Sequence, residues 1–131
     1  MKFAAVLILV ASAACSAAAG KVVSSKHARV PVALWVGGDD GLTQRLADAL
    51  RTEFGKSRKF ALSDADTRKS LRVTIPENVG WREINGRTQV NYEVRLARGV
   101  QSFRGRRGVC WETELAVCAK EIVRNASLSL R

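Results

Sequence analysis

The sequence predicts an α+β fold in which a mainly antiparallel, mixed sheet carries two helices on one face. Two segments, at about 41–54 and 111–126, have apolar residues at helical spacing. Around 71–76 and 90–97, apolar and polar residues instead alternate, which is typical of strands with one face covered. Because the apolar side of each strand must be buried, we expect both helices on the same face of the sheet.

The first strand and the first helix are predicted next to each other in the chain. Val30 to Val36 form a mostly apolar run that ends at Gly37-Gly38, as in a buried strand. Asp39 and Asp40 then offer an N-cap, and Gly55 is placed to end the helix. The apolar stripe of this helix consists of Leu42, Leu46, Leu50 and Phe54, at steps of four.

Shorter strands are expected between the two helices. Phe60 to Leu62 favours a short second strand, and Asn78 to Gly86 a loop or a twisted hairpin that carries Trp81. After the turn at Gly99, residues 100–104 are candidates for pairing back on the strand before them, and a loop is predicted at 105–108.

The first twenty residues carry the three parts of a secretory signal peptide. They are the positive Lys2, the short apolar run of residues 3–10, and a stretch of small residues that ends at Gly20. We expect residues 1–19 to be a signal peptide, 20–28 a flexible segment, and 29–131 a single α+β domain. The predicted location is the bacterial periplasm or the exterior.

Lipidation at Cys15 is the alternative way to process this leader. The small residues Ala13 and Ala14 fit a lipoprotein signal, but Ser12 stands where a large aliphatic residue is preferred. Cleavage at the A-x-A pattern before Gly20 is therefore favoured over a lipid-anchored outer-membrane lipoprotein.

Charge and cysteines narrow the function classes. The net charge is +10 and becomes +9 when Lys2 leaves with the signal peptide, which favours an envelope protein or an anionic envelope component as partner. The composition disfavours nucleic acid as a partner, because aromatic residues make up 6% of a chain that is predicted to be exported. Cys110 and Cys118 form an even pair, which predicts a disulfide in an oxidising compartment. With His27 they are too few ligands for a structural zinc site, and no metal is predicted.

No catalytic residues and no cofactor are predicted. The serines lack a nucleophile context. The glycine-rich segment 37–41 lacks the lysine and hydroxyl of a phosphate loop. Asp64 and Asp66 are interpreted as a turn before a strand. The tryptophans Trp35, Trp81 and Trp111 are interpreted as core or edge packing.

An arginine cluster is the candidate binding site. Arg106 and Arg107 lie between two glycines at a predicted loop tip, where guanidinium groups suit phosphate or carboxylate. The candidate residues are Arg98, Arg104, Arg106 and Arg107.

Residues 30–76 resemble a recurring module of bacterial envelope proteins. The runs V-A-L-W-V, D-G-L-T-Q-R-L-A-D-A-L-R-T-E-F, K-F-A-L-S-D-A-D and S-L-R-V-T-I are similar to the strand-helix-strand module of the TolB N-terminal domain and of CsgG- and LpoB-like proteins. The resemblance implies a TolB-N-like α/β sandwich that binds protein partners without catalysis.

These observations predict a non-enzymatic exported binding or accessory protein of the bacterial cell envelope. The alternative is a small secreted enzyme or enzyme inhibitor that acts through the arginine-rich loop 104–108.

Overall fold

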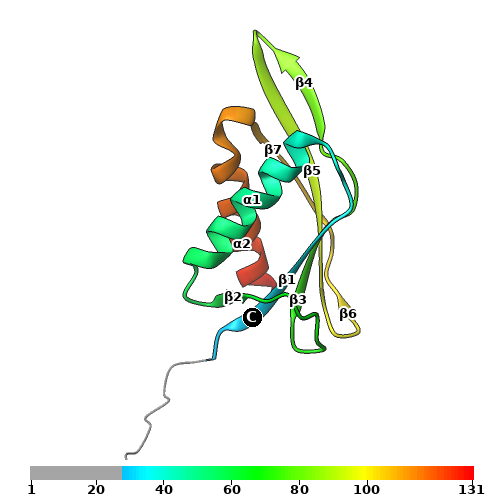
Figure 1. The fold of residues 1–131 in the computed structure, drawn as a ribbon, viewed down its shortest axis with the longest axis vertical. Coiled ribbons are helices and arrows are strands. Elements are labelled where there is room, and N and C mark those ends of the chain that lie inside the picture. Colours follow the sequence, from blue (N-terminus) through cyan, green and yellow to red (C-terminus); the bar gives the residue numbers. More distant parts are fainter. Residues whose placement is uncertain (1–27) are drawn as a thin grey trace, which may run out of the picture.

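The domain is a seven-stranded mixed sheet with both helices on one of its faces (Figure 1). The computed structural model describes residues 28–131; the predicted signal peptide, Cys15, His27 and most of the predicted flexible segment 20–28 lie outside that range. In chain order the elements are β1 (Val30–Val36), α1 (Gly41–Lys56), β2 (Phe60–Leu62), β3 (Leu71–Ile75), β4 (Gly80–Ile84), β5 (Arg87–Arg98), β6 (Gln101–Ser102), β7 (Arg106–Trp111), a 3-10 turn (Glu112–Glu114) and α2 (Leu115–Ser129).

Strand β5 organises the sheet, because it is long enough to pair with four other strands. The strands follow one another in the order β2-β1-β3-β5-β4. Strands β3 and β4 pair with different parts of one edge of β5, and β6 and β7 pair with its opposite edge. Strand β1 is parallel to β2 and to β3, whereas every pairing of β5 is antiparallel. The predicted α+β class with a mainly antiparallel, mixed sheet is confirmed.

The core lies between the helices and the sheet face that they cover. Alternate residues of β5, from Val90 to Leu96, are buried. Helix α1 adds Leu46, Leu50 and Phe54 at its steps of four, all fully buried. The Phe54 ring meets the Phe60 ring of β2 edge to face, with 5.3 Å between the ring centroids. The period-two strands and the helical stripes therefore meet as predicted.

The two helices end later than the sequence patterns indicate. Helix α1 continues through Gly55 and ends where Ser57 turns to an extended conformation, with its N–H bonded to the Phe54 carbonyl. The prediction that Gly55 ends the helix was wrong, because Gly55 keeps a negative φ and the helix does not need a left-handed residue there. Helix α2 starts at Leu115, after the 3-10 turn, and extends to Ser129.

Asp40 is the N-cap of α1, as predicted. Its carboxylate accepts a hydrogen bond from the Thr43 backbone N–H at 2.7 Å, and this bond lowers the pKa of Asp40 below its ordinary value of 3.8. A carboxylate with a lowered folded pKa stabilises the fold above the unfolded pKa and stops doing so as the pH falls through the folded value.

We expect Asp40→Asn, which keeps the acceptor but not the charge, to change the pH dependence of stability. The free-energy advantage of the wild type over Asp40→Asn should be full above about pH 5 and should shrink on acidification. Urea unfolding of both proteins across the acidic range measures it. An advantage that does not change with pH would contradict this role of the ionised cap.

Gly37 and Gly38 serve close packing. A β-carbon at Gly37 would lie 2.2 Å from the Pro76 carbonyl oxygen, and one at Gly38 would lie 2.4 Å from the Asn78 side chain. Asn78 Oδ1 accepts hydrogen bonds from the backbone N–H groups of Asp39 and Asp40 at 2.8 and 3.2 Å. The glycines therefore allow the β1–α1 loop to lie against the chain that leaves β3.

Candidate functional site

The arginine-rich segment is a strand along much of its length. A loop was predicted at 105–108, but β7 begins at Arg106, and Arg106–Trp111 pair with Gln89–Val94 of β5. The prediction was wrong because the long β5 offers an unpaired edge there, and backbone pairing outweighs the turn preference of the glycines. Arg106 and Arg107 are nevertheless exposed, as predicted.

Three of the four predicted arginines come together. Arg104, Arg106 and Arg107 line one surface hollow with Glu93. Arg98 lies apart from them, near the C-terminal end of β5, where its Nε donates to the Lys69 carbonyl at 3.2 Å. We call Arg104, Arg106 and Arg107 the arginine group.

Glu93 is the acidic residue of this hollow. Arg95 Nε donates to one carboxylate oxygen at 3.1 Å, and Arg107 Nε donates to the other at 3.2 Å. The hydrogen bond from Arg95, and after it that from Arg107, lowers the pKa of Glu93 below its ordinary value. Within residues 28–131, no ion pair joins Arg104 or Arg106 to an acidic residue, so their charges are available to a partner.

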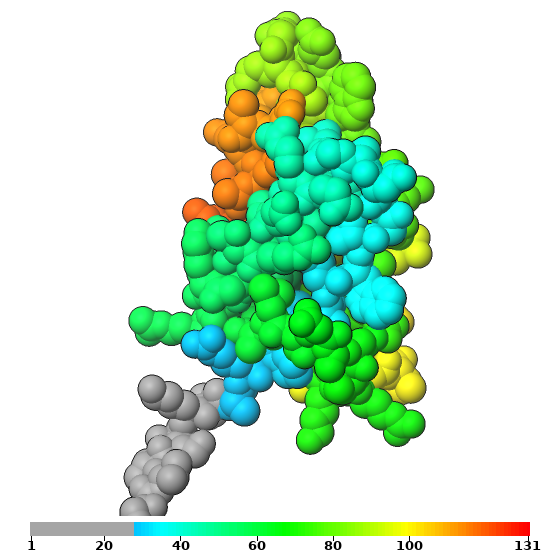
Figure 2. Space-filling view, in the orientation of Figure 1, coloured from blue at the N-terminus to red at the C-terminus, as the bar shows by residue number. Residues whose placement is uncertain are grey.

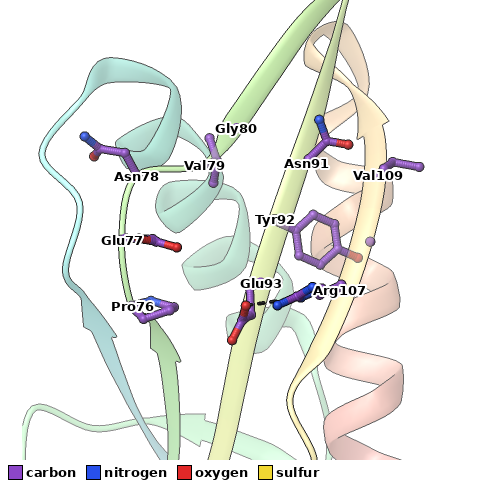
Figure 3. A pocket seen from close by; sticks show the side chains of 11 residues that line it. Pro76, Glu77, Asn78, Val79, Gly80, Asn91, Tyr92, Glu93, Arg107 and Val109 are labelled. Atoms are coloured by element: carbon purple, nitrogen blue, oxygen red, sulfur yellow. Dashed lines mark hydrogen bonds and ion pairs between the residues drawn. The ribbon is translucent and has the colours of Figure 1, made fainter.

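A break in the sheet adjoins the hollow. One edge of β5 pairs with β3 through residues 95–98 and with β4 through residues 87–91, which leaves residues 92–94 without a partner strand on that edge. The break opens into a cleft of about 470 Å³ between Pro76–Gly80, Asn91–Glu93 and Arg107–Val109 (Figure 3). We call this cleft the sheet window.

The Glu93 peptide group faces the sheet window. Asn85 and Gly86 both have positive φ, at 50° and 74°, which defines a two-residue hairpin turn closed by the hydrogen-bonded pair Ile84–Arg87. Hydrogen-bonded pairs alternate along an antiparallel ladder. The odd-numbered residues of β5 therefore direct their N–H and C=O groups to this edge, and only Glu93 does so within the window.

The sheet face away from the helices carries arginines and partly exposed aromatic rings. Arg72 lies over the Trp35 ring at 6.0 Å, and Arg87 lies over the Trp111 ring at 4.1 Å. Trp35 is 55% exposed on this face. Trp81 lies opposite the buried Val90, so its side chain is on the helix-bearing side of the sheet, but it is 65% exposed because the β4–β5 hairpin projects beyond the helices (Figure 2). Trp35 and Trp81 were interpreted as core or edge packing. The core alternative is wrong for both, because their side chains are exposed in the structure of residues 28–131. Trp81 does lie on an edge strand, β4.

A further depression, a groove between β7 and α2, shares Arg107 with the hollow of the arginine group. It has a volume of about 550 Å³ and is lined by Arg107, Gly108 and Val109 of β7 and by α2 residues from Val117 to Asn125. Tyr92 reaches toward it beneath β7 (Figure 3), since a β-carbon at Gly108 would lie 2.2 Å from the Tyr92 hydroxyl oxygen. Burial, and then the negative charge of Glu121, raises the pKa of this phenol, so Tyr92 stays protonated at neutral pH.

The predicted disulfide is present and holds this groove together. Cys110 of β7 and Cys118 of α2 are bonded, with their Cα atoms 5.8 Å apart. The bridge links the two elements that form the walls of the groove.

Residues 28–131 contain neither a candidate metal site nor a helix that could span a membrane. From residue 28 onward, no three His, Cys, Asp or Glu side chains gather where a metal ion could be held. Neither α1 nor α2, the two helices of this part of the chain, is long and apolar enough to cross a membrane.

Comparison with known proteins adds no assignment: no protein-family model, no curated protein and no solved structure matches this chain. The resemblance to the TolB N-terminal domain stays a prediction.

Sequence reasoning missed the partners of the arginines. Glu93 was treated only as a polar position of the alternating strand, and Val109 and Val117 were not singled out. The alternation of β5 placed Glu93 on the uncovered face, but the residue opposite it, Arg107, follows only from the strand pairing.

Proposed function

We propose that this protein is a non-enzymatic exported binding or accessory protein of the bacterial envelope, and that the arginine group holds an anionic partner. The single observation that carries the proposal is the composition of the hollow. It has three exposed arginines and one carboxylate, which Arg95 and Arg107 already neutralise. Excess guanidinium charge on an exposed surface attracts carboxylate or phosphate groups. The signal peptide predicted at residues 1–19 supports export.

The state of Glu93 favours binding over catalysis. A general base must take up a proton near the working pH. The two arginine hydrogen bonds favour the ionised form of Glu93 and lower its pKa, which makes the carboxylate a weak base. Glu93 is better suited to orienting Arg107 at the surface than to moving a proton.

We expect Arg106→Ala with Arg107→Ala to weaken partner binding about tenfold or more, because arginines at the centre of an interface carry much of its binding energy. Stability should change by less than about 0.5 kcal/mol, since exposed charges contribute little to folding. Mild crosslinking in the native host, followed by co-purification and mass spectrometry, identifies the partner. Titration of that partner with both proteins measures the loss.

Arg58→Ala with Arg68→Ala is the matched control. It removes the same charge from the two exposed loops that flank β2, away from the hollow. The control should retain most of the binding, and high salt should weaken binding by the wild type. Equal losses in both double variants would show that only net charge matters. Unchanged binding in the Arg106/Arg107 variant would overturn the proposal, and a soluble enzyme as partner would point to an inhibitor instead.

A further inference from the structure

The outer edge of β7 is an unpaired strand edge. Within residues 28–131, β7 pairs only with β5. The Leu96 carbonyl accepts a hydrogen bond from the Phe103 N–H at 2.8 Å, so the even-numbered residues of β5 direct their backbone groups toward β6 and β7. The even-numbered residues of β5 lie opposite the even-numbered residues of β7, so their backbone groups form hydrogen bonds with each other. Arg107 and Val109 therefore direct their N–H and C=O groups outward.

This edge forms one wall of the groove between β7 and α2. Val109 and Val117 are 58% and 57% exposed, and they provide apolar surface on the two walls. In Figure 3 the Val109 side chain points away from β5. An extended peptide that pairs with β7 would bond to outward backbone groups and place alternate side chains near these valines.

The sheet window offers less to such a peptide. Of the β5 residues 92–94, only Glu93 directs its backbone N–H and C=O toward it, between the ends of β3 and β4. The β7 edge instead offers two outward residues in succession, Arg107 and Val109, beside an open groove. Strand addition is therefore better served by the β7 edge than by the window.

Charge selects the kind of peptide that this edge accepts. The groove carries Arg107, Lys120 and Arg124, and the hollow that shares Arg107 with it carries Arg106. The acidic groove residue Glu121 already pairs with Arg124 at 2.7 Å. A second copy of β7 would bring like charges together, and charged edge strands resist this kind of self-association. An acidic strand would meet opposite charge along the same edge.

We propose that the outer edge of β7 binds an extended acidic segment of a partner protein, which adds as a further strand in the groove between β7 and α2. This inference rests on the proposed function and specifies the partner as an acidic peptide.

The first test uses peptides as probes. Nine-residue peptides with blocked ends, in which Glu alternates with Val, Ile or Thr, are titrated into the oxidised domain. Binding is followed by fluorescence anisotropy. We expect members of this pool to bind and the Lys-for-Glu counterparts not to bind. N-methylation of alternate amides on the β7-facing edge of the best binder should weaken it about tenfold or more, because it removes backbone donors without changing charge.

The second test changes the protein. Val109→Pro removes an outward N–H, and proline is tolerated on an edge strand where that N–H bonds to no neighbour. We expect Val109→Pro to keep its near-ultraviolet circular dichroism and lose peptide binding about tenfold or more. Val109→Thr keeps the N–H and the branched shape but replaces one methyl group by a hydroxyl, so it should lose clearly less binding than Val109→Pro.

Three results would overturn the inference: no acidic peptide binds, the N-methylated peptide binds as tightly as its parent, or folded Val109→Pro binds like the wild type. If Val109→Pro fails to fold, the N-methylated peptide decides alone.

The crosslinked partner distinguishes the two proposals. If Arg106→Ala with Arg107→Ala loses that partner while folded Val109→Pro keeps it, strand addition fails and the proposed function stands. If both keep it, the proposed function fails as well.

Discussion

Phe54→Ala is expected to lower the free energy of unfolding by about 3–5 kcal/mol, because it leaves a cavity in a close-packed core. Phe54 is fully buried on α1, and its ring contacts Phe60 at the edge of the sheet. The loss combines the burial of the ring, its contact with Phe60, and the cavity that α1 and β2 cannot close. Equilibrium urea unfolding of the oxidised protein measures it.

Thr52→Ala is the matched control for the helix itself. Thr52 is exposed on the same turn of α1, and alanine is a good helix former, so stability should change by less than about 0.5 kcal/mol. Phe54→Leu retains most of the buried volume and should lose less than Phe54→Ala. A Phe54→Ala loss no larger than that of the Thr52 control would contradict the packing of α1 on the sheet.

The second large effect is expected from the disulfide. Replacing both Cys110 and Cys118 by alanine should lower the free energy of unfolding by about 2.5 kcal/mol, the loop-closure entropy that a bridge across eight residues of sequence removes from the unfolded chain. The Cys118 side chain is 2% exposed, so its loss also removes some buried contact. Urea unfolding with and without a reductant gives both values.

The reductant provides the internal control for this prediction. It should shift the wild type toward the double variant and leave the double variant unchanged. A wild type that is equally stable in its reduced and oxidised forms would show that the bridge does not contribute. Because the bridge joins β7 to α2, reduction is also expected to weaken binding in the groove between them.

Local patterns in the sequence determined most of the elements. The bounds of β1, from Val30 to Val36, and of β2, from Phe60 to Leu62, agree with the predicted runs. The period-two alternation predicted β5, and the steps of four predicted α1, with Asp39 and Asp40 as candidates for the cap that Asp40 provides. These predictions succeeded because a helix or strand that is buried on one face repeats its apolar residues with the period of that element. This repeat can be seen within a short stretch of sequence. The disulfide was also predicted from the sequence, because Cys110 and Cys118 are an even pair in a chain that is predicted to reach an oxidising compartment.

Only the tertiary structure decided how the arginines are used. The glycines around Arg106 and Arg107 indicated a loop, but the free edge of β5 draws this segment into the sheet as β7. Strand pairing then places Arg107 opposite Glu93 and separates Arg98 from the arginine group. The uncovered positions of Trp35 and Trp81 are also set by the placement of the helices. Which side chains meet across two strands depends on the register between segments that are far apart in the chain. A local repeat of apolar residues does not determine that register.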